Sequence, residues 1–181
     1  MNEFTLFAQP WWVNLFIFVP FVAYAWWRKR GLAISNGTLV VAALFGIAFG
    51  FVEASVVVYL RAAVGLFPGY GGTLADVARL SSGVYQNAQL LGDLPESLVT
   101  IEVLREAETM IMLLTIAFLA ARSFRERCAL FLWSFAGWDI FYYVGLWLTV
   151  GWPPSLLTAD VLFLIPVPWI VQVWFPFLSA L

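Results

Sequence analysis

Long apolar runs constrain this chain more than any other feature of its sequence. A membrane-spanning α-helix needs roughly 20 mostly apolar residues. Five runs approach that length: Trp11–Trp27, Thr38–Leu60, Leu98–Ala121, Cys128–Val150 and Thr158–Leu181. The sequence therefore predicts an all-α integral membrane bundle of five transmembrane helices, in one domain covering residues 1–181. Prolines inside the first and last runs predict kinks there, at Pro20, Pro166, Pro168 and Pro176.

The composition agrees with a lipid environment. The chain is 63% hydrophobic and 11% charged, with a mean hydropathy of +0.91, which excludes an ordinary water-soluble domain. Aromatic side chains make up 18% of the residues, including ten tryptophans, and such rings concentrate where hydrocarbon meets lipid headgroups. Residues Met1–Pro10 contain no Lys or Arg, so we expect the first run to be a spanning helix rather than a cleaved signal.

The chain lacks the residues that several functional classes require. The chain has no histidine and a single cysteine, Cys128, so we expect no haem and no thiolate metal site. The glycines of Gly65–Gly72 are not followed by the Lys-Ser/Thr of a phosphate loop, so no nucleotide is expected. A net charge of −2 predicts no nucleic-acid partner. The expected partner is the lipid bilayer.

Basic residues predict the orientation. Six of them would lie on one side of the membrane: Arg28, Lys29, Arg30, Arg122, Arg125 and Arg127. Positive charge favours the cytoplasmic side, which places the N-terminus outside and the C-terminus of a five-helix bundle in the cytoplasm. The long connection, residues 62–97, is then extracytoplasmic. Within it, Thr73 and Asp76 form a capping-box pattern that predicts a short helix.

One run combines small residues with an acid. Gly46, Gly50 and Ala54 share a stripe with Glu53 when residues 38–60 are helical. The Gly-x-x-x-Gly step is typical of close helix contact in membranes. We therefore expect this face, together with Arg61 at its end, to point into the bundle.

Other ionisable residues lie at membrane depth, where each one is a candidate functional residue. Glu102, Arg105 and Glu106 share one helical face of residues 98–121. Asp139 falls near mid-bilayer in the fourth run, with two tyrosines one turn further out as donors. The complete predicted cluster contains Glu53, Arg61, Glu102, Arg105, Glu106, Asp139, Tyr142, Tyr143 and Asp160.

Five acids in this cluster face two bases, Arg61 and Arg105. Three carboxyl groups must then be protonated, exposed to water or bound to a cation, and Glu53, Glu106 and Asp139 are the candidate metal ligands. In a helical fifth run, Pro166 and Pro168 would also free two backbone carbonyls near the cluster. The alternative is structural: acids in the headgroup region, Glu53 paired with an arginine, and Asp139 hydrogen-bonded to a tyrosine.

Four stretches resemble a group of uncharacterised bacterial inner-membrane proteins. They are FGFVEASVVVYLR (Phe49–Arg61), LREAETMIML (Leu104–Leu113), WDIFYY (Trp138–Tyr143) and GWPPSLLTADVLFLIPVPW (Gly151–Trp169). The resemblance covers about half the chain and implies a multi-pass protein of the bacterial inner membrane. It implies no catalytic residues.

Three functions remain open from the sequence. The carboxylate cluster could bind a cation or relay protons. The chain could instead be an accessory subunit or assembly factor of a larger membrane complex, or associate with copies of itself. It would then offer a partner either the first run or an outward aromatic face of the fifth run, made of Phe163, Trp169, Trp174 and Phe177. A membrane-embedded enzyme acting on a lipid-like substrate is the third, although no motif of a known nucleophile or metal site appears.

Overall fold

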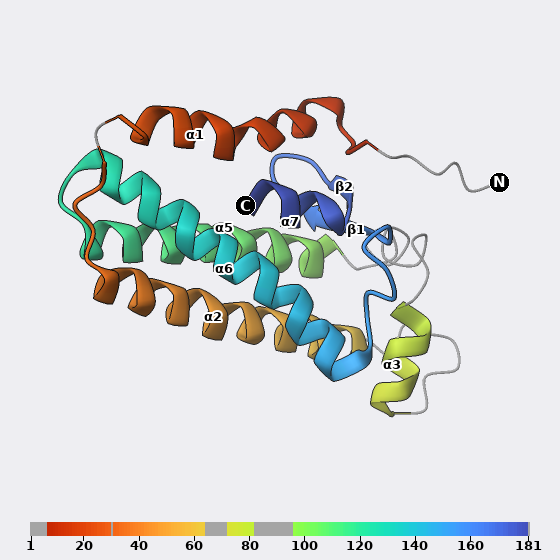
Figure 1. Cartoon of the computed structure of the whole chain (residues 1–181). Helices are drawn as coiled ribbons and strands as arrows, with labels where there is room; N and C mark the ends of the chain where they lie inside the picture. Colours follow the sequence, from red (N-terminus) through yellow and green to blue (C-terminus); the bar gives the residue numbers. More distant parts are fainter. Residues whose placement is uncertain (1–6, 30, 64–71, 82–95, 181) are drawn as a thin grey trace.

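The computed structural model describes residues 7–29, 31–63, 72–81 and 96–180, and these residues are mostly helical (Figure 1). Three long helices pack along one another: α2 (Asn36–Ala63), α5 (Glu96–Ala120) and α6 (Phe124–Val150). The 3-10 helix η1 (Trp11–Phe18) continues into α1 (Val19–Trp27) on one side of this group. The short helix α3 (Leu74–Ser81) begins where the capping pattern predicts, because the Asp76 amide donates to Thr73 Oγ1 at 3.2 Å.

The prediction of five apolar spans is wrong. Within the described ranges, α2 and α6 are the two helices long and apolar enough to cross a membrane. The first run divides into eight residues of 3-10 helix and nine of α-helix, which is fewer than the roughly 20 residues of a regular α-helical span. Helix α5 has 25 residues but carries four charged side chains near its middle, Glu102, Arg105, Glu106 and Glu108.

The fifth run is not a spanning helix. It forms strand β1 (Ala159–Phe163), strand β2 (Trp169–Gln172) and the seven-residue helix α7 (Trp174–Ala180). The two strands are antiparallel, and Pro166 and Pro168 lie in the turn between them. Proline removes a helical hydrogen bond and clashes with the preceding turn, so two prolines in three residues favour a turn over a kinked helix. The prediction of a cytoplasmic C-terminus assumed a fifth spanning helix, and that helix is not present in residues 158–180.

The outer edge of strand β2 pairs with the segment that precedes η1. Gln9, just before η1, exchanges two backbone hydrogen bonds with Ile170 of β2, at 2.9 and 2.8 Å. The Trp169 ring stacks on Phe16 of η1, and Phe163 packs beside Trp138 of α6. The edge of a sheet presents unpaired backbone groups, and Gln9 supplies partners for those of Ile170 in β2.

Helices α2 and α6 meet almost backbone to backbone. A Cβ added at Gly46 would lie 2.7 Å from the Ser134 carbonyl oxygen, and one at Gly50 would lie 2.4 Å from that of Trp138. A Cβ at Gly145 of α6 would lie 2.8 Å from the Ala54 Cβ. The small residues at these positions are therefore required by the packing, and the contact face expected on α2 has α6 as its partner.

Helix α6 begins four residues before the predicted start at Cys128. Ser123 and Glu126 form a capping box, which satisfies the first backbone donors and draws the polar residues 124–127 into the helix. At the other end Gly151 adopts φ 66°, a left-handed conformation that terminates helices and favours glycine.

The two basic linkers lie at the same end of the molecule. One joins α1 to α2 and the other joins α5 to α6, both at the left of Figure 1. The Arg125 guanidinium donates a hydrogen bond to the Gly31 carbonyl and so ties the linkers together. Arg28, Lys29, Arg122 and Arg127 belong to the same end, whereas Arg30 lies outside the described residues. Strands β1 and β2, helix α3 and the start of η1 lie toward the opposite end (Figure 1).

Candidate functional site

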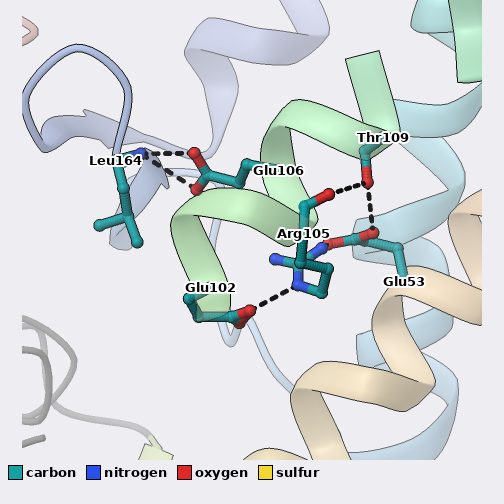
Figure 2. Close-up of polar contacts among 6 residues, drawn as sticks. All are labelled: Glu53, Glu102, Arg105, Glu106, Thr109 and Leu164. Carbon is teal, nitrogen blue, oxygen red and sulfur yellow. Dashed lines mark hydrogen bonds and ion pairs between the residues drawn. The ribbon is translucent and has the colours of Figure 1, made fainter. Parts of the chain in front are cut away.

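Arg105 of α5 is the centre of a polar group between α2 and α5 (Figure 2). Its guanidinium forms an ion pair with Glu53 of α2 and a second, at 2.5 Å, with Glu102 one turn earlier on α5. Thr109 Oγ1 lies 3.0 Å from the Arg105 carbonyl oxygen and 3.4 Å from Glu53 Oε2. Glu53 is buried, so an unpaired charge on it would be costly. The ion pair with Arg105 supplies a partner and links the two helices.

Glu106 points the other way, toward the hairpin. Figure 2 shows its two carboxyl oxygens directed at the backbone of Leu164, whose amide lies 3.0 and 2.9 Å from them. Leu164 follows β1 at the start of the turn, so α5 provides the acceptor for a backbone donor of the hairpin. The Glu106 side chain is buried.

A second polar group lies between α6 and β1. The Tyr143 hydroxyl donates to Asp160 Oδ2 at 3.1 Å, and both residues are buried. Asp139 lies one helical turn from Tyr143, is 1% exposed, and is close enough to Asp160 for their carboxyl groups to interact electrostatically. Its Oδ1 atom is buried with no hydrogen-bond partner among the described residues. Of the two tyrosines expected as donors to Asp139, Tyr143 donates to Asp160.

The predicted residues fall into two groups rather than one. Glu53, Glu102, Arg105 and Glu106 lie on the interface of α5 with α2 and the hairpin. Asp139, Tyr143 and Asp160 form the other group, with the Tyr142 ring packed edge to face on Tyr143 at 4.9 Å. The side chain of Arg61 lies outside the described residues. In the described part of the chain, no three Asp, Glu, His or Cys side chains are grouped so that they could hold a metal ion.

Two expectations tied to a helical fifth run are wrong. Residues 162–164 are strand and turn, so Pro166 and Pro168 do not free carbonyls of a helix there. The aromatic residues Phe163 and Trp169 pack on each other at 5.3 Å inside the molecule instead of forming an outward face.

Sequence reasoning also missed one functional contact, the Leu164 amide. In a helical fifth run the Leu164 amide would bond within the helix. In the turn it is available to donate to Glu106. Thr109 could have been added to the site, because it lies four residues after Arg105 on the same helical face.

Comparisons with protein families, with curated proteins and with solved structures find no match to this chain. The function is therefore argued from its own residues.

Proposed function

We propose that the chain is a multi-pass protein of the bacterial inner membrane with four helical crossings and a re-entrant C-terminal hairpin. The crossings are η1 with α1, then α2, α5 and α6. The apolar character of α2 and α6 supports this arrangement, as does their close glycine contact. The basic linkers share one end, which positive-inside logic assigns to the cytoplasm. The hairpin then enters from the extracytoplasmic side.

The function that the geometry supports best is reversible proton binding at Asp139. The observation that carries it is the buried Oδ1 of Asp139, which has no partner among the described residues. Burial makes an unpaired charge costly, and no described residue donates a hydrogen bond to this oxygen. Asp139 therefore holds a proton, and Tyr143, one turn closer to the extracytoplasmic end of α6, donates a hydrogen bond to Asp160.

The group around Arg105 has a different role in this proposal. One guanidinium pairs with both Glu53 and Glu102, and in this proposal that part of the cluster is a structural ion pair that joins α2 to α5. This role corresponds to the structural alternative raised by the sequence, in which Glu53 pairs with an arginine. Proton binding is assigned to the second group alone.

The pH dependence of stability tests the proton site. The folded protein buries Asp139 as the neutral acid, so ionisation is favoured on unfolding and stability falls as pH rises. The Asp139→Asn variant is neutral at every pH, and we expect it to lose this part of the fall in melting temperature. Asp76→Asn on α3 is the matched control and should keep it. Identical pH profiles for Asp139→Asn and the unaltered chain would contradict the proposal.

A further inference from the structure

An apolar groove separates the first helical segment from the start of α6. It has a volume of about 290 Å³ and is lined on one side by residues from Leu15 to Trp27, on the other by Cys128 and Leu132. Its side chains are almost entirely hydrocarbon and aromatic. Such a space does not retain water, so in a bilayer it is open to lipid chains.

The groove is long enough to cross one leaflet. From Leu15 to Trp27 the chain rises about 20 Å, given the rise per residue of 3-10 and α-helices. One leaflet contributes about 15 Å to the hydrocarbon core of a bilayer. A single acyl chain lying along α1 would therefore occupy the groove from its basic end inward.

Two unused donors lie at the basic end. Trp27 Nε1 and Arg125 Nε are both buried, and neither has a hydrogen-bond partner among the described residues. Trp27 lines the groove, and Arg125 lies one turn before Cys128, which also lines it. Arg28 and Lys29 follow Trp27 directly and are exposed. Buried donors normally have partners, and phosphate or ester oxygens of a lipid would supply them here.

We propose that this groove binds one anionic phospholipid, with an acyl chain between α1 and α6 and its phosphate at Trp27 and Arg125. Anionic headgroups are favoured because the described cations Arg28, Lys29, Arg122, Arg125 and Arg127 lie at this end. The site rests on the proposed membrane location but not on proton binding. The charge of the headgroup and the length of the acyl chain determine which lipid binds in the groove. The polar groups around Arg105 and Asp139 take no part in this choice.

Native mass spectrometry of the full chain tests the site, with phosphatidylglycerol and phosphatidylcholine of identical acyl chains as probes. We expect one phosphatidylglycerol to bind at least about tenfold more tightly than phosphatidylcholine. Val22→Trp, at an exposed position that lines the groove, should weaken both lipids. Leu148→Trp, equally exposed on α6 but away from the groove, is its control. Arg125→Gln should remove the preference for phosphatidylglycerol and keep acyl-chain binding.

Alkylation of Cys128 gives a second readout, since it is the single cysteine of the chain. Bound phosphatidylglycerol should slow its reaction with N-ethylmaleimide, and phosphatidylcholine at the same concentration should not. Equal binding of the two lipids, or unchanged phosphatidylglycerol binding in Val22→Trp, would overturn the proposal. Asp139→Asn should bind phosphatidylglycerol as the unaltered chain does, which separates a failure here from a failure of the proton site.

Discussion

Arg105 forms ion pairs with two carboxylates at once, so its loss would leave both of them without a cation partner. Removing it would leave Glu53 buried without a cation, whereas Glu102 is less enclosed. The energetic consequence comes mainly from the charge left behind rather than from the attraction that is lost.

We predict that Arg105→Leu destabilises the protein by about 3 to 5 kcal/mol, the range typical of a broken buried ion pair. Adding Glu53→Leu should restore part of the loss, because the double variant no longer buries an unpaired carboxylate. The free energy of unfolding, measured by denaturant titration of the protein in detergent micelles, reports both effects. Arg122→Gln in the exposed linker is the control, and a loss in Arg105→Leu no larger than in this control would refute the account.

At the residue level, the sequence raised the pairing of Glu53 with an arginine as one alternative, and it gave no sign of the hairpin contact. Helical periodicity places Glu102, Arg105 and Glu106 on one face, and Glu53 on the inward stripe of its own helix, so their meeting was foreseeable. Glu106 bonds a backbone amide of a turn. Periodicity carries no information about such a donor, because it depends on the tertiary path of the chain.

Among the elements, the pair α2 and α6 depends on the absence of side chains at two glycines. The Gly50 position is the tighter, with 2.4 Å to the Trp138 carbonyl oxygen against 2.7 Å to that of Ser134 at Gly46. Backbone atoms cannot rotate away as side chains do, so any added Cβ must push the helices apart.

Gly50→Ala should therefore destabilise the protein by about 1 to 3 kcal/mol, the usual range for overpacking. Gly37→Ala provides the control in the same helix, because its added Cβ would meet only Ser35 Oγ at 3.7 Å. Alanine favours helix over glycine, so this control should be neutral or slightly stabilising. Thermal unfolding of both variants decides the matter, and equal melting temperatures would be inconsistent with the packing described.

The fifth run shows where element prediction from hydrophobicity fails. Residues 158–181 are apolar enough for a span, and length alone favours a helix. Pro166 and Pro168 carry the opposite signal, since neither can donate to a helix. The β-branched and aromatic residues on both sides of them, Val161 and Trp169 to Val171, suit strands. Giving the prolines more weight would have predicted the hairpin.

For the whole molecule, the number of crossings fixes where the C-terminus lies. Four crossings return the chain to the side of its N-terminus, whereas the five predicted from apolar runs would not. The positive-inside assignment of the linkers is common to both arrangements.

A C-terminal fusion separates them. We predict that alkaline phosphatase fused to the C-terminus is active and that green fluorescent protein fused there is dark, as expected outside the cytoplasm. The same reporters inserted after Gly31, in the linker between α1 and α2, should give the reverse pattern. A fluorescent C-terminal fusion would favour an odd number of crossings.

The most direct test of the central claim is an infrared titration of the protein labelled with ¹³C-aspartate in lipid bilayers. A protonated carboxyl group has a carbonyl stretch distinct from that of a carboxylate. The proposal predicts such a band at neutral pH, its disappearance in Asp139→Asn, and its persistence in Asp76→Asn. If the neutral-pH spectrum has no protonated aspartate band, or if the band survives in Asp139→Asn, Asp139 is not the proton site.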